Sequence, residues 1–306
     1  MVISASRRTD IPGFYGEWLL LRLKEGEVLF SNPFSPKRLT RLHFSPQTVE
    51  ALVLWTKNPQ PFLPLLPELD RLFYRYYFSF TLTGYGPDWE PGLPDTAKRI
   101  DCFRRLSDRL SPERVDWRYD PVILSGERDI RFHLEQFSRL CRQLAPYTTR
   151  CIFSFFDSYR HLGSRFLPPG EEQMKELAAG FAAIAREYRL PLVTCAEKLD
   201  LREYGIGHAA CIDPEKIGRL CGRPPEMKKD AGQRPACGCA PSIDIGAYDT
   251  CLYGCTYCYG TRSLSRARCR HAAHDPACPL LEGPVPQEAI ITERWAQPQA
   301  PEQLSF

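Results

Sequence analysis

Short hydrophobic runs recur at intervals along the first two hundred residues of the chain. Each run is five to ten residues long and rich in β-branched or aromatic side chains, as is typical of a β-strand. Six of them are predicted to be strands, at residues 2–6, 51–56, 76–83, 114–123, 150–156 and 191–196.

The segments between these runs have helical periodicity. In the stretch 171–188, Leu177, Phe181 and Ile184 fall on one face of a helix, and the other predicted helices cover 13–23, 95–110 and 130–144. Alternating strands and helices indicate an α/β fold with a parallel sheet. The chain has no GxGxxG turn, so six units favour a full or partial six-unit β/α barrel over an open doubly wound sheet.

The periodic pattern ends near residue 205. The stretch 222–238 is rich in Gly, Pro, Lys and Arg, one further helix is predicted at 214–220, and the Pro-rich segment 282–306 lacks apolar periodicity. We therefore expect a barrel over residues 1–205 and an extension over residues 206–306 that packs on it.

Composition and charge narrow the classes of protein. The chain has 306 residues, of which 43% are hydrophobic, enough to bury a full core. It shows neither a secretory signal pattern nor an apolar stretch that could span a membrane, so we expect a cytoplasmic protein. With 40 basic and 37 acidic side chains, the net charge of +3 does not by itself indicate a nucleic-acid-binding protein.

Cysteine is the unusual feature of the composition. The chain has thirteen cysteines, ten of them between Cys195 and Cys278. In a protein without an export signal, a metal or catalytic role is more plausible than a disulfide framework, because the cytosol keeps thiols reduced.

The segment Cys251-Leu-Tyr-Gly-Cys255-Thr-Tyr-Cys258 carries the clearest chemistry. Three thiolates within eight residues can ligate three irons of a [4Fe-4S] cluster and leave the fourth iron without a protein ligand. An open iron can chelate S-adenosylmethionine, which one electron then cleaves to a 5′-deoxyadenosyl radical. A structural zinc site or a plain electron-transfer cluster is the alternative, although zinc sites usually show two paired ligands.

The C-x3-C-x2-C spacing resembles the signature of the radical S-adenosylmethionine superfamily. That superfamily is built on a six-unit partial barrel, and the resemblance implies that Tyr257 packs near the adenine and that a reductase, ferredoxin or flavodoxin supplies the electron. Its members usually carry the three cysteines after the first strand. Here they follow all six, so the extension is expected to fold back over the barrel mouth.

The whole chain also resembles a prokaryotic family catalogued as a domain of unknown function. The segments that carry this resemblance are SASRRTDIP at 4–12, LWTKNP at 54–59, DWRYDP at 116–121, CGC at 237–239, and SIDIGAYDTC, GC and YCY between 242 and 259. The resemblance runs from the first strand to Tyr259 and implies no particular reaction.

Polar residues follow the predicted strands, where β/α folds gather their active sites. Arg7 and Arg8 follow the first strand and suit a carboxylate or phosphate, although a salt bridge to Asp10 is the structural alternative. Lys57 and Asn58 end the second strand, where the superfamily often binds the methionine amino group; the usual GGE is missing here. On the fourth strand, alternation places Arg118 and Asp120 on one face and Trp117 and Tyr119 on the other.

Four further cysteines are candidates for a second, auxiliary iron–sulfur cluster. Cys237 and Cys239 lie close together in a loop, Cys211 follows a Gly-rich turn, and Cys195 ends the sixth strand. Cys195 and Cys211 are equally compatible with inert core residues, because free cysteine often packs in protein cores.

Two functions therefore remain. The first is a radical S-adenosylmethionine enzyme whose substrate is unknown. The second is an iron–sulfur or zinc protein whose extension binds a partner, including nucleic acid through Arg262, Arg266, Arg268 and Arg270.

Overall fold

A computed structural model describes residues 1–32, 35–224 and 227–297 of the chain. All six predicted strands form, with ends within two residues of the expected ones. They are β1 (Val2–Ala5), β4 (Ala51–Thr56), β5 (Tyr76–Thr81), β6 (Val115–Val122), β7 (Cys151–Phe155) and β8 (Leu192–Thr194).

These strands form the centre of one parallel sheet with eight strands. Two short strands from the extension complete it: β10 (Ser242–Asp244) pairs with β1, and β9 (Gly207–His208) pairs with β8. The order is β10-β1-β4-β5-β6-β7-β8-β9. Among the described strands, β10 and β9 are not paired with each other, so the sheet is open rather than a full barrel, and it has eight strands where six were expected.

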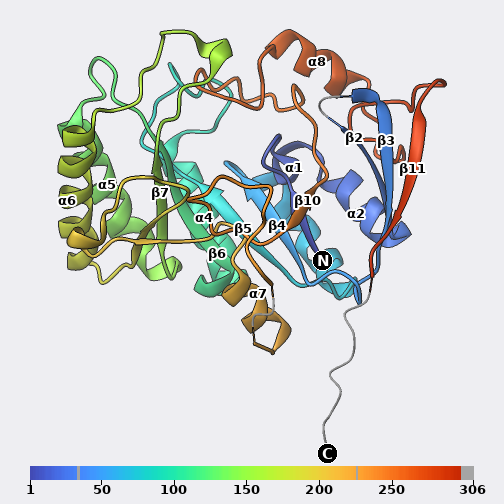
Figure 1. Ribbon diagram of the computed structural model, residues 1–306, viewed down its shortest axis with the longest axis horizontal. Helices are drawn as coiled ribbons and strands as arrows, with labels where there is room; N and C mark the ends of the chain where they lie inside the picture. The colour runs from blue at the N-terminus through green and yellow to red at the C-terminus, as the bar shows by residue number, and fades with distance from the viewer. Residues whose placement is uncertain (33–34, 225–226, 298–306) are drawn as a thin grey trace, which may run out of the picture.

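The described part of the chain has the helices α1 (Ile11–Phe14), α2 (Gly16–Glu25), α3 (Leu66–Arg71), α4 (Thr96–Leu110), α5 (Ile130–Leu144), α6 (Glu171–Glu187), α7 (Pro214–Cys221) and α8 (Leu264–Ala272) (Figure 1). The helices predicted at 13–23, 95–110, 130–144, 171–188 and 214–220 correspond to α2, α4, α5, α6 and α7. α4, α5 and α6 pack on one face of the sheet, whereas α7 packs on the other, where Lys216 pairs with Asp116 of β6. Asp95 and Asp129 begin α4 and α5, where each carboxylate accepts a hydrogen bond from a backbone N–H three residues later.

The two faces of the sheet have different side chains because residues alternate along each strand. On β6, Trp117 and Tyr119 are fully buried in the main core beneath the helices. Arg118 and Asp120 point to the other face, where they line a cavity. The alternation predicted these two pairs, and the structure shows which of them faces the cavity.

A second, three-stranded sheet was not predicted. It consists of β2 (Glu27–Asn32), β3 (Ser35–His43) and β11 (Ile290–Trp295), in the order β11-β3-β2. The polar sequence of β3, SPKRLTRLH, gave no clear strand signal. β11 lies in the Pro-rich segment 282–306, in which no strand was predicted; residues 298–306 of that segment lie outside the described part.

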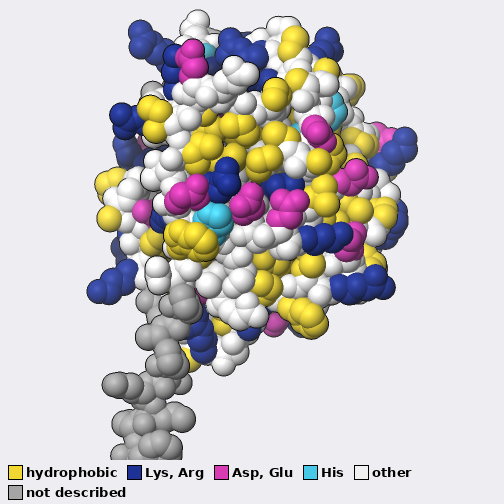
Figure 2. Space-filling model, turned by 90° about the vertical axis from the view of Figure 1, so that its right-hand side faces the viewer, with side chains coloured by type: hydrophobic (Ala, Val, Ile, Leu, Met, Phe, Trp, Pro, Cys, Tyr) yellow, Lys and Arg dark blue, Asp and Glu magenta, His cyan; other side chains and the backbone are white. Residues whose placement is uncertain are grey.

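The outer side of this second sheet is mixed in character. Figure 2 shows hydrophobic side chains interspersed with acidic and basic ones on this face, and Trp295 stacks on His43 with 3.9 Å between ring centroids. Strands from before and after residue 205 share both sheets, so the expected parts 1–205 and 206–306 are joined by backbone hydrogen bonds. None of the described helices has the length and apolarity needed to cross a membrane.

Candidate active site and cysteine centres

A cavity of about 540 Å³ lies at the carboxyl ends of the parallel strands. Its walls include residues that follow β1, β4, β7 and β8, residues of β6 itself, and residues of the extension between 233 and 260. Both predicted cysteine groups reach this cavity. The extension therefore lies against the strand ends, at the edge of the sheet where β/α folds place their active sites.

The loop that carries Cys251, Cys255 and Cys258 is held in place by Asp249. The Asp249 carboxylate accepts hydrogen bonds from the backbone N–H groups of Arg262 and Ser263 at 2.6 and 2.9 Å, and its own N–H donates to the Gly260 carbonyl. These bonds join the two ends of the cysteine loop. The loop is therefore fixed by local hydrogen bonds, and all three of its cysteines line the cavity.

Two close backbone contacts position this loop against the segment that follows β1. A Cβ atom on Gly260 would lie 2.6 Å from the carbonyl oxygen of Arg8, and one on Gly246 would lie 2.1 Å from the Ser6 hydroxyl. Any larger residue would force the two segments apart. Glycine at these positions thus allows the extension to reach the end of β1.

The motif thiols lie in a partly desolvated environment. Burial raises the pKa of Cys251 and raises that of Cys255 to about 12, so without a metal ion these groups are thiols. The sulfur of Cys258 accepts hydrogen bonds from the N–H groups of Gly260 and Thr261, both at 3.3 Å. Such N–H donors stabilise a thiolate, as they do around cluster sulfurs.

Tyr257 and Lys57 belong to a buried charge network beside Cys255. The Lys57 ammonium lies 2.7 Å from Oε1 of Glu90 and donates to the Tyr257 hydroxyl at 2.9 Å. Arg99 pairs with the second oxygen of Glu90 at 3.0 Å. Burial opposes the charge on Lys57, but the Glu90 carboxylate outweighs it and raises the pKa of Lys57, with a smaller contribution from Cys255. Two cations and one carboxylate thus lie next to a motif cysteine.

Asn58 lies outside the residues that line the cavity. Its side-chain oxygen accepts from the Gln60 N–H at 3.4 Å, and its backbone carbonyl accepts from the Tyr253 hydroxyl at 3.4 Å. Asn58 therefore contacts the motif loop through its backbone, while Lys57 is the residue of this pair that reaches the cavity.

Arg7 and Arg8 both line the cavity but have different partners. Arg7 pairs with Asp244 of β10 through its backbone N–H at 2.8 Å and its Nε at 3.7 Å. Arg8 donates to the Gly246 carbonyl at 3.3 Å and lies over the Tyr248 ring at 5.5 Å. Arg7 is thus partly neutralised by a carboxylate, and Asp244 rather than Asp10 is its partner. The partners of Arg8 are a backbone carbonyl and an aromatic ring.

Asp10 binds backbone rather than arginine. It accepts from the N–H groups of Gly13 and Lys57 and from the Thr56 hydroxyl, at 2.8, 2.6 and 3.0 Å. Burial raises the pKa of Asp10 to about 6 despite these donors. The carboxyl joins the segments that follow β1 and β4.

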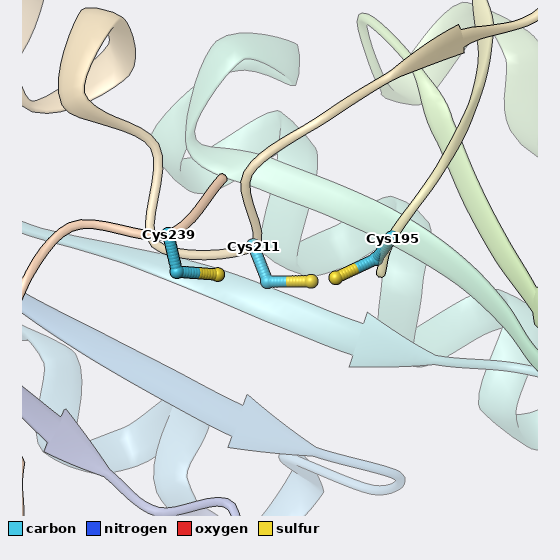
Figure 3. A group of neighbouring side chains, drawn as sticks. All are labelled: Cys195, Cys211 and Cys239. Carbon is cyan, nitrogen blue, oxygen red and sulfur yellow. The ribbon is translucent and has the colours of Figure 1, made fainter. Parts of the chain in front are cut away.

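The second cysteine group is compact. The sulfurs of Cys195, Cys211 and Cys239 all lie within 4.8 Å of one another, and Figure 3 shows that their side chains come from separate segments of chain. Cys237 lies two residues before Cys239 and is also buried. The structure thus brings together three of the four cysteines that were predicted to form an auxiliary site, and the fourth, Cys237, lines the same cavity. None of the four forms a disulfide.

A buried cation accompanies this group. The Arg118 guanidinium donates to the Cys211 sulfur at 2.8 Å and pairs with Asp120. Hydrogen bonds from the Cys195 and Cys239 thiols, followed by the charge of Arg118, lower the pKa of Cys211 well below its usual range. The backbone N–H of Ile212 donates to the Cys239 sulfur at 3.4 Å. The contacts of Cys211 favour a thiolate at that residue, whereas the pKa of Cys195 and that of Cys239 are raised.

Comparison with known protein families shows which family the chain belongs to. The model of a family described as a domain of unknown function, DUF1848, matches residues 2–260. The chain belongs to the DUF1848 family. The matched range includes both cysteine groups and every segment on which the resemblance was based, and the family description assigns no reaction.

Other comparisons add little to this assignment. No curated protein matches the DUF1848 chain. Among solved structures, a protein from Bacteroides thetaiotaomicron described as a "putative alpha-L-fucosidase" aligns at 11% identity over 73% of this chain and 83% of its own, with a TM-score of 0.28. A similarity at that score carries no argument about the fold or the reaction of the DUF1848 chain.

Several residues of the DUF1848 site were not singled out from the sequence. Glu90 lies in the loop between β5 and α4, where a single carboxylate gives no signal of burial. Asp244 binds the side chain of Ser4 at 3.0 Å and that of Ser6 at 2.5 Å, and the motif SIDIG was noted only as part of a resemblance. Pairing with β1 could not be inferred from a strand of three residues.

Some of the arginines that were proposed to contact nucleic acid have partners within the protein. Arg266 pairs with Asp249 at 3.0 Å, Arg270 donates to the Tyr248 carbonyl, and Arg262 lies 5.9 Å from the Tyr248 ring. Lys and Arg side chains gather at the upper edge of the face in Figure 2, the end of the molecule where α8 lies. In the DUF1848 structure, Arg262, Arg266 and Arg270 contact the segment that leads into the cysteine loop.

Proposed function

We propose that this chain is an iron–sulfur enzyme of the radical S-adenosylmethionine type. In this proposal Cys251, Cys255 and Cys258 hold a [4Fe-4S] cluster, and S-adenosylmethionine binds in the cavity that these cysteines line. The observation that carries the proposal is that a three-cysteine loop lies at the carboxyl edge of a parallel sheet, facing a cavity large enough for a small ligand. The central strands would then correspond to the partial barrel of that superfamily.

The residues present fit such a cluster. The motif offers three thiolates, which leaves one iron of a cubane for a ligand that is not protein. The N–H groups of Gly260 and Thr261 point at the Cys258 sulfur, and Lys57 supplies positive charge beside Cys255. When bound, the cluster supplies the electron that cleaves S-adenosylmethionine to methionine and a 5′-deoxyadenosyl radical.

The chain's own side chains would bind and orient the ligand. Arg8, at the cavity wall, suits the methionine carboxylate because a guanidinium can donate two parallel hydrogen bonds to it. Tyr257 lines the same cavity, and its hydroxyl is held by Lys57 and Glu90, so its ring is fixed for packing against an adenine. An external reductase, ferredoxin or flavodoxin would supply the electron.

A direct test follows from the products. The protein is reconstituted anaerobically with iron and sulfide and then incubated with dithionite and S-adenosylmethionine. We expect 5′-deoxyadenosine to form. An electron-transfer or zinc protein, with or without a nucleic-acid partner, would release none, so absence of the nucleoside from a fully loaded sample would refute the proposal.

Variants show whether the motif is responsible. Cys255→Ala should remove the cluster absorbance at roughly 400 nm and all 5′-deoxyadenosine, because each thiolate ligates a different iron. Cys269→Ala is the matched control, since Cys269 is exposed on α8 close in sequence to the motif. The control should retain both signals. Product formation by the Cys255→Ala variant at the wild-type rate would show that the motif is not the reactive centre.

A further inference from the structure

The second cysteine group carries an inference that does not depend on the proposed function. Cys195 follows β8, Cys211 follows β9, and Cys237 and Cys239 lie in the loop before β10. Residues 209–241 contain only one helix, α7, and no strand among the described positions. Three sulfurs therefore converge from three segments in the least regular part of the fold, and Cys237 lies two residues from one of them.

The spacing of the sulfurs discriminates between kinds of metal centre. Around one tetrahedral ion with metal–sulfur bonds of about 2.3 Å, the sulfurs lie about 3.8 Å apart. In a cubane each thiolate binds a different iron, so the sulfurs are held farther apart. The sulfurs of Cys195, Cys211 and Cys239 are within 4.8 Å of one another; within the described residues, the three motif sulfurs do not form a group that close.

The surroundings also fit a charged thiolate centre. Cys211, Cys237 and Cys239 are buried, with 4%, 6% and 2% of their surfaces exposed. Four thiolates around a divalent ion carry a net charge of −2, and the buried Arg118 donates directly to one of the sulfurs. The same guanidinium pairs with Asp120, so it links the Cys211 sulfur to a carboxylate. The Ile212 N–H adds a further donor to Cys239.

We propose that Cys195, Cys211, Cys237 and Cys239 bind a single tetrahedral divalent ion, Zn²⁺ or Fe²⁺, in place of a second [4Fe-4S] cluster. Binding converts thiols to thiolates and releases their protons to solvent, with no change in oxidation state. The ion joins the loops after β8 and β9 to the segment that leads into β10, and so fixes one wall of the cavity. Zn²⁺ and Fe²⁺ share this ligand chemistry, although thiolates generally bind Zn²⁺ more tightly.

Metal and sulfide analysis of the full-length chain tests this proposal. In the Cys255→Ala variant, which lacks cluster iron, we expect about one ion per chain and no labile sulfide. The same metal analysis shows whether the ion is zinc or iron. X-ray absorption at its edge should show about four sulfurs at about 2.3 Å and no metal–metal neighbour. A value of about four irons with matching sulfide in this variant would establish a cubane and overturn the proposal.

Ligand variants make the assignment specific. In the Cys255→Ala background, replacing Cys237 and Cys239 by serine should remove the single ion, whereas Cys221→Ser should retain it. Cys221 is the matched control because it lies in the same segment, half-buried, and its thiol donates to the Glu50 carbonyl instead. If the double variant is insoluble, the single Cys195→Ser variant replaces it, since Cys195 is only half-buried. Retention of the ion by a folded ligand variant would overturn the proposal.

The two proposals fail in different ways. The assay for 5′-deoxyadenosine tests the proposed cluster at Cys251, Cys255 and Cys258. The number of metal ions that the Cys255→Ala variant retains tests the proposed site in the second cysteine group. A sample with a single tetrahedral ion but no S-adenosylmethionine cleavage would support the second site and refute the proposed function.

Discussion

At the scale of single residues, buried charges around Glu90 connect the cysteine loop to the core. Glu90 is 1% exposed and Arg99 is 1% exposed, so neither is solvated by water. Burial raises the pKa of a lone carboxyl, but Lys57 and Arg99 together outweigh burial and keep the pKa of Glu90 below its usual value. The carboxylate therefore neutralises one of two cations beside Cys255.

Removing the charge of Glu90 is expected to destabilise the protein strongly. Glu90→Gln leaves Lys57 and Arg99 without their carboxylate partner in a buried site, which costs about 3 to 5 kcal/mol. Denaturant unfolding of the variant and the wild type, compared at neutral pH, measures the difference.

Glu68→Gln is the matched control for this prediction. Glu68 pairs with Lys24 on the surface, where both side chains are more than 40% exposed, so its loss should change the unfolding free energy by less than about 1 kcal/mol. Equal small effects for the two variants would mean that the Glu90 network contributes nothing beyond a surface ion pair.

At the scale of elements, α7 connects the two ends of the second cysteine group. Asp213 begins this helix and accepts from the N–H groups of Glu215 and Lys216 at 2.9 and 3.2 Å. The same carboxylate pairs with Arg150 at 2.6 Å, and Lys216 pairs with Asp116 at the start of β6 at 2.5 Å. One side chain thus caps α7 and helps to attach it to the sheet.

Two helix caps with different surroundings allow a quantitative comparison. Asp129→Ala removes an exposed cap of α5 and should cost about 1 kcal/mol. Asp213→Ala removes a cap and also a charged partner of Arg150, and should cost about 2 to 4 kcal/mol. The unfolding free energies of both variants, measured under the same conditions, test this order. Equal costs would show that the Arg150 pair adds no stability.

At the scale of the whole molecule, the extension is part of the main fold. It supplies β9 and β10 to the large sheet and β11 to the small one. It also accepts hydrogen bonds from α2: the Trp18 indole N–H donates to the Cys278 carbonyl at 2.9 Å, and Arg22 donates to the Ala277 carbonyl at 3.0 Å. Both donors are buried.

A chain that ends at residue 205 is therefore expected to be insoluble or unstable. It would expose the edge of β1, leave β3 without its parallel neighbour, deprive the Trp18 indole N–H of its acceptor and remove one acceptor of Arg22. Expression level, solubility and thermal unfolding are the measurements.

A chain ending at residue 297 is the control, because it keeps every contact described above. It should behave like the full-length protein. If the shorter chain were soluble and unfolded at the same temperature as the full-length protein, the extension would be an independent appendage.

The sequence by itself determined the parts of this protein that depend on near neighbours. The predicted strand 51–56 matches β4 to the residue, and the predicted helix 130–144 matches α5 to the residue. Both could be predicted because side-chain periodicity acts within a few residues. The spacing of Cys251, Cys255 and Cys258 likewise predicts a cluster motif without knowledge of the fold.

The tertiary structure alone decided which distant segments meet. Periodicity could not place the three-residue β10 beside β1, nor choose whether Arg118 or Trp117 faces the cavity. It could not show that Cys195 lies against Cys211 and Cys239. Such contacts join residues far apart in the chain, and they form only when burial of the core fixes how the sheet, the helices and the extension pack together.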